Sequence, residues 1–306
     1  MSSNLGHVVV IGMSENRIEL VDFVGKFGGT PIWEETSKSL KVMTRNQVFT
    51  KKVAATQFKI PSLATNSKYV GKFVKLAKST NLKPAFALDM LDLDIQGQPR
   101  RVAEVEFAGG VPTIVVYRNR IQCAEEMNAI HTAWSKICVD TNTYGDKITN
   151  DGLRPWLHDV IDDLGGFSYV AGHGAFFVPQ STTKWNDCGA VLAEVRHKIL
   201  DLNPRNCMTV VPIADDPTQR EDIARNAFEH YTRSMTSMLS EIESLRQRFD
   251  EEDVAIRSTT ILARMEALSQ MRNRIFEYQS LVDMSTDMLT SQYMETFEWL
   301  EAACTK

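Results

Sequence analysis

Apolar and polar positions change their spacing several times along the first 65 residues. The run HVVVIG at 7–12 is almost continuously apolar and predicts a buried strand. Apolar residues recur at helical spacing from 14 to 29, which predicts a helix with Ser14 as its N-cap and Gly28-Gly29 as its stop. Short β-like pieces separated by polar turns then continue to about residue 65.

The stretch NSKYVGKFVKLAKSTNLK at 66–83 contains lysines and no acidic residue. Its spacing predicts a helix over about 68–79 with Tyr69, Phe73 and Leu76 on the buried face. The opposite face would then carry a row of cations: Lys68, Lys72, Lys75 and Lys78. Further along, the run at 100–120 has two β-rich segments around Gly109-Gly110 and predicts a β-hairpin.

The middle of the chain alternates helical and strand-like patterns. We expect helices at 123–138, at about 150–164 ended by Gly165-Gly166, and at about 182–200. We expect a hairpin of FSYVA and AFFVP across Gly172-His173-Gly174, and a strand at 207–214. This order fits a small α+β sheet. A helix followed by a hairpin also resembles a winged-helix module, although the acidic residues of the helix oppose DNA binding.

From Pro217 to its end the chain has helical spacing throughout. Two long helices separated near DEED at 250–253 indicate an antiparallel hairpin similar to a coiled coil. Its apolar positions include Tyr231, Met235, Ile242, Leu268 and Tyr278. The hairpin could pack within one chain, or its seam over 217–300 could be shared between subunits of a homo-oligomer.

These elements together predict the α+β class, with mixed N-terminal and central regions before the helical hairpin. The predicted domains are a basic α+β domain at 1–120, a central helix–hairpin–helix–strand domain at 121–215 and a helical hairpin at 216–306. A chain of 306 residues is long enough for several domains.

Charge divides the chain unevenly. Residues 1–120 hold 17 Lys and Arg against 10 Asp and Glu, a net charge of +7, whereas residues 121–306 hold 17 against 29, a net charge of −12. Residues 36–88 contain eleven cations and no acid. Such asymmetry indicates a polyanionic partner for the basic part, because binding follows the local charge rather than the net charge of −5.

Seven lysines form the candidate nucleic-acid-binding set: Lys51, Lys52, Lys59, Lys68, Lys72, Lys75 and Lys78. Lysine contacts phosphate as a point charge and reads bases poorly, so we expect DNA or RNA binding that is largely independent of sequence. The alternative is that these lysines dock on an acidic protein surface, including the acidic C-terminal part of the same chain.

The run from LRPWLHDVIDDLGGFSYVAGHGAFFVP to the first tail helix resembles an uncharacterised family from phages and actinobacteria. The resemblance rests on Gly165-Gly166, the aromatic strand Phe176 to Pro179, and the strand Pro212 to Asp215 before long helices. It covers roughly residues 150–250. It implies a phage or mobile-element origin and no particular chemistry, since the family is one of unknown function.

The sequence contains no motif that would indicate catalysis or a cofactor. VVVIGMSEN lacks the glycines of a nucleotide-binding loop, and the histidines do not have the spacing of metal ligands. The paired acids of DLDI at 92–95, of 162–163 and of 215–216 are the starting point for a metal-dependent hydrolase, although such pairs usually act as helix caps. Cys188 and His173 could meet, but nothing orients them as nucleophile and base. We therefore predict no catalytic residue, no metal and no cofactor.

The sequence therefore predicts a non-enzymatic phage or mobile-element protein that associates with nucleic acid through its N-terminal lysines. One alternative is a protein-interaction factor that engages a host or phage protein through the helical tail, and another is a metal-dependent hydrolase. Five widely spaced cysteines and the lack of a long apolar run indicate the host-cell cytoplasm and no membrane association.

Overall fold

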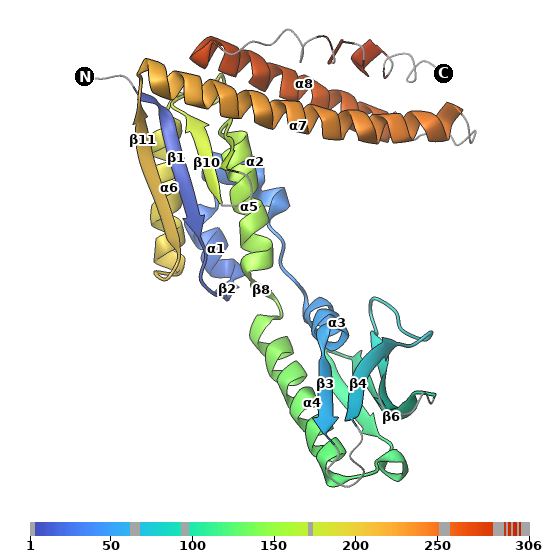
Figure 1. Cartoon of the computed structure of the whole chain (residues 1–306). Helices are drawn as coiled ribbons and strands as arrows, with labels where there is room; N and C mark the ends of the chain where they lie inside the picture. Colours follow the sequence, from blue (N-terminus) through green and yellow to red (C-terminus); the bar gives the residue numbers. More distant parts are fainter. Residues whose placement is uncertain are drawn as a thin grey trace. The chain divides into compact units, whose positions relative to one another are not determined.

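The computed structural model describes residues 4–61, 68–92, 98–170, 174–250, 258–283, 291, 293–294, 296–298 and 300 (Figure 1). The contacts divide the chain into two compact units, neither of which is continuous in sequence. The first unit contains residues 1–14, 34–36 and 157–306, and the second contains residues 15–33 and 37–156.

The second unit is built on a five-stranded antiparallel sheet in the order β3-β4-β5-β6-β7. The strands are β3 (Gln57–Pro61), β4 (Lys68–Lys75), β5 (Ala85–Asp92), β6 (Arg100–Ala108) and β7 (Val111–Val116). Helices α3 (Arg45–Ala55) and α4 (Ala124–Tyr144) pack on one face, where Phe49, Val53, Ile130 and Ile137 join the apolar residues of the sheet. The other face of the sheet carries charged side chains such as Lys72, Asp89 and Glu104 together with exposed valines such as Val74 and Val115. The predicted hairpin around Gly109-Gly110 is confirmed as β6 and β7.

The predicted helix at 68–79 is wrong, because this segment is strand β4 and a turn. Tyr69 and Phe73 are buried, as expected, but a spacing of four residues places two side chains on one face of a strand as well as of a helix. Gly71 resolves the ambiguity, because the ring of Phe58 on β3 lies 2.5 Å from the position that a Cβ would occupy. The lysines of 68–79 therefore do not form a helical row.

Residues 14–61, most of which belong to the second unit, also depart from the prediction. The helix α1 (Leu20–Phe27) begins after the short strand β2 (Ile18–Glu19), which pairs with β8 (Lys147–Ile148), so Ser14 is not its N-cap. The β-like region up to residue 65 contains helix α2 (Pro31–Thr36), a 3-10 turn η1 (Ser37–Ser39) and helix α3 before β3. A capping box of Thr44 and Gln47 starts α3, and this signal was present in the sequence. A second 3-10 turn, η2 (Arg118–Arg120), precedes α4.

The first unit contains a four-stranded antiparallel sheet in the order β11-β1-β10-β9. β1 (Asn4–Gly12) lies between β11 (Cys207–Ala214) and β10 (Ala175–Pro179), and β9 (Phe167–Val170) forms the far edge. The predicted strands at 7–12 and 207–214 and the pairing of FSYVA with AFFVP are confirmed, while residues 171–173 of the turn lie outside the described residues. A sheet that includes β1 supports the α+β interpretation of this region rather than the winged-helix one.

Two shorter helices accompany this sheet. Helix α5 (Asn150–Asp163) belongs to this unit from residue 157 onwards and ends where predicted, and Gly165 adopts a positive φ of 77°. Helix α6 (Cys188–Leu202) begins six residues after the predicted start at 182, because Asp187 is its N-cap and accepts a hydrogen bond from the Ala190 N–H.

The C-terminal region forms the long helices α7 (Pro217–Asp250) and α8 (Ser258–Val282), which pack along each other (Figure 1). Arg264 of α8 forms an ion pair with Glu241 of α7 at 2.8 Å. The predicted seam positions are buried within this one chain, among them Met235, Ile242, Leu268 and Tyr278. This burial favours the intramolecular alternative for the seam. The connection at 251–257 lies outside the described residues, so the hairpin as such stays a prediction. No helix among the described residues has the length and apolar character needed to cross a bilayer.

Candidate functional site

The seven candidate lysines all belong to the second unit and fall on a helix, two strands and a turn. Lys51 and Lys52 are on α3, Lys78 lies in the turn between β4 and β5, and the remaining four are on strands β3 and β4. The structure describes the backbone of Lys68, which stands opposite Pro61 in the register of these two strands. The lysines of the set therefore lie in different surroundings.

The cations of α3 are paired with acids that come much later in the sequence. Arg45 bonds to Asp146 at 3.2 Å, Lys52 bonds to Asp140 at 3.0 Å, and Lys51 forms an ion pair with Asp151, one hundred residues away. The Lys52 ammonium also lies 4.8 Å from the centre of the Tyr144 ring. These acids cancel the charge of α3 locally, so Lys51 and Lys52 are weak candidates for phosphate contact.

Lys78 is paired as well. Its ammonium lies 3.0 Å from Glu104 on β6. Hydrogen bonds from Lys78 and then from Tyr117 lower the pKa of Glu104, and the bond to Glu104 raises the pKa of the Tyr117 hydroxyl. Glu104 therefore stays ionised and neutralises Lys78.

Three of the candidate lysines remain exposed and form no ion pair within the part of the chain that the structure describes: Lys59, Lys72 and Lys75. We call these three residues, which lie on two faces of the sheet, the β3–β4 lysine surface. Lys75 stands opposite Phe86 in register and is exposed at the end of β4, on the face opposite to that of Lys72. Lys59 pairs in register with Val70, and Lys72 follows Val70 by two residues on the same strand, so Lys59 and Lys72 are diagonal neighbours about 7–8 Å apart. Asp89 on β5 stands opposite Lys72, but its carboxylate bonds to Arg101 at 3.3 Å.

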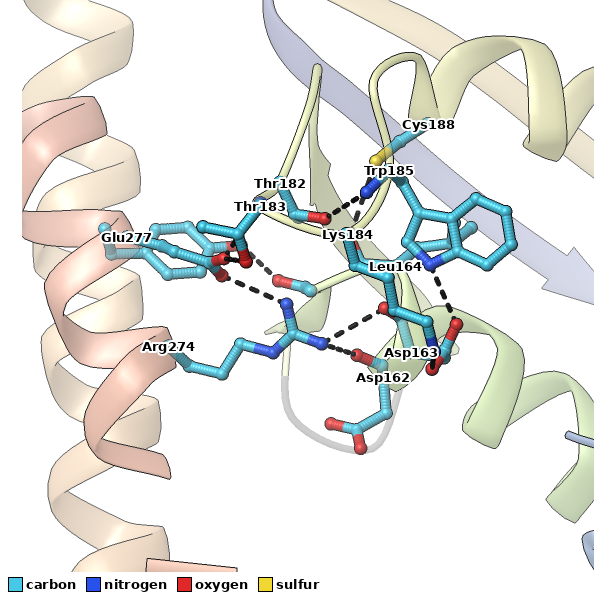
Figure 2. Close-up of polar contacts among 12 residues, drawn as sticks. Asp162, Asp163, Leu164, Thr182, Thr183, Lys184, Trp185, Cys188, Arg274 and Glu277 are labelled. Atoms are coloured by element: carbon cyan, nitrogen blue, oxygen red, sulfur yellow. Dashed lines mark hydrogen bonds and ion pairs between the residues drawn. The ribbon is translucent and has the colours of Figure 1, made fainter. Parts of the chain in front are cut away.

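A second polar cluster lies in the first unit and was not predicted from the sequence. Figure 2 shows Arg274 reaching from α8 towards the end of α5, where its guanidinium donates to the backbone oxygens of Asp162 and Asp163, each at 3.1 Å, and to Glu277 at 3.0 Å. The Tyr278 hydroxyl donates to the Gly165 oxygen at 2.8 Å. A cation at the C-terminal end of a helix satisfies free carbonyls and complements the helix dipole.

This cluster continues around Asp163. Lys184 bonds to Asp163 at 2.6 Å, and the Trp185 indole N–H donates to Asp163 at 2.8 Å (Figure 2). Lys184 also bonds to Glu35 at 2.8 Å. The adjoining cavity has a volume of about 600 Å³. Its wall includes Asp162, whose pKa is raised by the loss of hydration and by the neighbouring carboxylates, although Arg274 opposes the shift. The bonds of Arg274 and Tyr278 join α8 to the corner between α5 and β9, so this cluster has a structural role.

Those residues considered for catalysis that the structure describes have structural surroundings. The Cys188 thiol is buried, lies 3.6 Å from the Leu164 oxygen, and has its pKa raised to about 11 by burial, so it is not an activated nucleophile. His173 and Asp94 lie outside the described residues. Asp215 forms an ion pair with Arg220, and Asp216 accepts from the Gln219 N–H as a cap of α7. The described residues contain no group of three or more His, Cys, Asp or Glu side chains placed to hold a metal ion.

Comparison with known proteins gives one informative result. No curated protein and no solved structure matches the chain significantly. The model of a family of unknown function, DUF6744, matches residues 104–297, which is more than half of the chain and extends beyond the 150–250 region of the predicted resemblance. The match carries no indication of a phage or actinobacterial origin. The chain therefore belongs to the DUF6744 family.

Proposed function

We propose that the protein associates with nucleic acid through the β3–β4 lysine surface. The observation that supports this proposal is the contrast in pairing, since Lys59, Lys72 and Lys75 are exposed without an acidic partner among the described residues while the other described lysines of the set are neutralised. Lys59 and Lys72 are neighbours on one face and repel each other, and a bound phosphate backbone relieves this repulsion. Binding of this kind is sensitive to salt and largely independent of sequence.

The expected site is smaller than the one predicted from the sequence. Lys51, Lys52 and Lys78 are no longer expected to bind phosphate, and the proposed phosphate ligands are the exposed lysines of β3 and β4. Three lysines neutralise few phosphates, so we expect modest affinity at physiological salt.

The test is fluorescence anisotropy with labelled single- and double-stranded DNA and RNA. We expect the Lys59→Glu/Lys72→Glu/Lys75→Glu variant to lose binding at least tenfold. A variant with the same change of net charge, Lys136→Glu/Arg154→Glu/Arg205→Glu, alters exposed cations elsewhere and serves as the matched control. The proposal is wrong if the wild-type protein binds none of the probes at about 50 mM salt, or if the two variants lose affinity equally.

A second candidate function is contact with another protein through α8. Leu262 and Phe276 are 57% and 37% exposed and are separated by close to four helical turns, so they share one face of α8. A partner that protects this face from hydrogen exchange and no longer binds Phe276→Asp would support this candidate, whereas unchanged binding to that variant would exclude it. We also propose that the protein originates from a phage or another mobile element. The identity of the genes adjacent to this one tests that origin.

A further inference from the structure

The sheet edges of the two units differ in how they are protected against pairing with another strand. β3 carries Lys59 and Pro61, both of which oppose pairing at an edge. On β11, the Arg196 side chain bonds to the Met208 oxygen at 2.8 Å. β9 has four residues, and α7 packs beside it. β7 has none of these protections along its six uncharged residues, VPTIVV, apart from Pro112 near its start.

The hydrogen-bonding pattern shows which backbone groups of β7 face outwards. Gly109 and Gly110 have φ values of +61° and +83°, as in the type I′ turn of a two-residue hairpin. Such a turn makes Val111 and every second residue after it bond to β6, and the Tyr117 N–H indeed donates to the Val102 oxygen at 2.8 Å. The backbone groups of Pro112, Ile114 and Val116 therefore point away from β6, where no described element pairs with them.

The side chains of β7 show that the core of the second unit is incomplete at this edge. Ile114 and Val116 pack against the core cluster but are only partly buried. On the opposite face of the strand Val111 and Val115 are 57% and 59% exposed. An additional strand beside β7 would bury apolar side chains on both faces and satisfy the free backbone groups.

We propose that β7 pairs with β7 of a second copy of this chain, antiparallel about a two-fold axis at Ile114. Ile114 then stands opposite the partner's Ile114, and Thr113 stands opposite the partner's Val115. No charge faces a like charge in this register, whereas self-pairing of β3 would bring Lys59 close to its own copy. The proline ring of Pro112 removes one hydrogen bond at each end. This interface is independent of the proposed nucleic-acid surface.

The first test is the mass of the full chain by sedimentation over a range of concentrations. Two six-residue edges bury less than about 1,000 Å² on pairing, so we expect a weak dimer that forms as the concentration rises. Val115→Lys should raise the dissociation constant at least tenfold, because a lysine on an edge opposes pairing. Val74→Lys makes the same change at a 45% exposed position on the interior strand β4 and should leave the dimer unchanged. A wild-type monomer at all concentrations, or equal dimers of the wild-type and Val115→Lys chains, would overturn the proposal.

The second test remains decisive if Val115→Lys disturbs folding. In the proposed register Thr113 and the partner's Val115 form a pair without mutual hydrogen bonds, with Cα atoms about 4.5 Å apart, close enough for a disulfide. In a background with Cys123, Cys138, Cys207 and Cys304 changed to Ser, mixing Thr113→Cys and Val115→Cys chains should give a disulfide-linked dimer with one chain of each kind. Each variant alone should give much less. The register would be contradicted if each variant alone cross-linked as well as the mixture, or if the mixture gave no disulfide-linked dimer.

Discussion

Helix α3 and the strand pair β3–β4 come from the same acid-free stretch of sequence and carry similar numbers of cations, but their surroundings differ. Each cation of α3 is paired with an acid: Arg45 with Asp146, Lys51 with Asp151 and Lys52 with Asp140. Lys59, Lys72 and Lys75 on the strands have no such partner among the described residues. The net charge of a sequence segment therefore does not give the charge of a surface, because the neutralising acids come from distant parts of the chain.

The lysine surface depends on 68–75 being a strand, and Gly71→Ala tests this directly. The new methyl group would meet the Phe58 ring, so we expect a loss of about 1–2 kcal/mol in the free energy of unfolding, measured by chemical denaturation. In a Phe58→Ala background the same change should cost little. A helical segment would instead gain about 1 kcal/mol from Gly71→Ala in both backgrounds, and that result would contradict the strand assignment.

The substitution Glu104→Gln should leave Lys78 without its acidic partner, so that Lys78 resembles the unpaired lysines of β3 and β4. The ammonium of Lys78 would lose its 3.0 Å ion pair and add a cation in the turn that follows β4. We expect binding of single-stranded nucleic acid to strengthen about threefold at low salt, as measured by anisotropy. Unchanged binding would show that Lys78 lies too far from the bound phosphates to contribute.

The paired cations of α3 should matter for stability rather than for binding. A double-mutant cycle on Lys52→Gln and Asp140→Asn should give a coupling of about 0.5 kcal/mol, because the pair is partly exposed. Nucleic-acid binding by Lys52→Gln should equal that of the wild-type chain within twofold. A marked loss of binding by this variant would place α3 in the interface and remove the distinction between the two regions.

The sequence predicted those helices and strands whose signals lie within a few neighbouring residues. The β6–β7 hairpin has paired β-rich runs and a Gly109-Gly110 turn, and α5 ends at Gly165 where a helix stop was expected. The helix predicted at 68–75 is wrong because an apolar spacing of four fits both a helix and a strand. The placement of β1 between β10 and β11, and of Arg274 at the end of α5, depends on contacts between distant residues that no local pattern encodes.

The candidate site was predicted only in part for the same reason. The acid-free stretch identified the region that holds Lys59, Lys72 and Lys75, but the ion pairs with Asp140, Asp151 and Glu104 required the fold.

The salt dependence of binding tests the central claim most directly. The slope of log K against log salt for single-stranded nucleic acid falls by about 0.7 for each phosphate contact that is lost. We expect Lys59→Gln/Lys72→Gln/Lys75→Gln to reduce the magnitude of the slope by about 2, and Lys51→Gln/Lys52→Gln to leave it unchanged. A slope that changes more in the α3 variant than in the strand variant would show that the protein binds through paired lysines, contrary to this account.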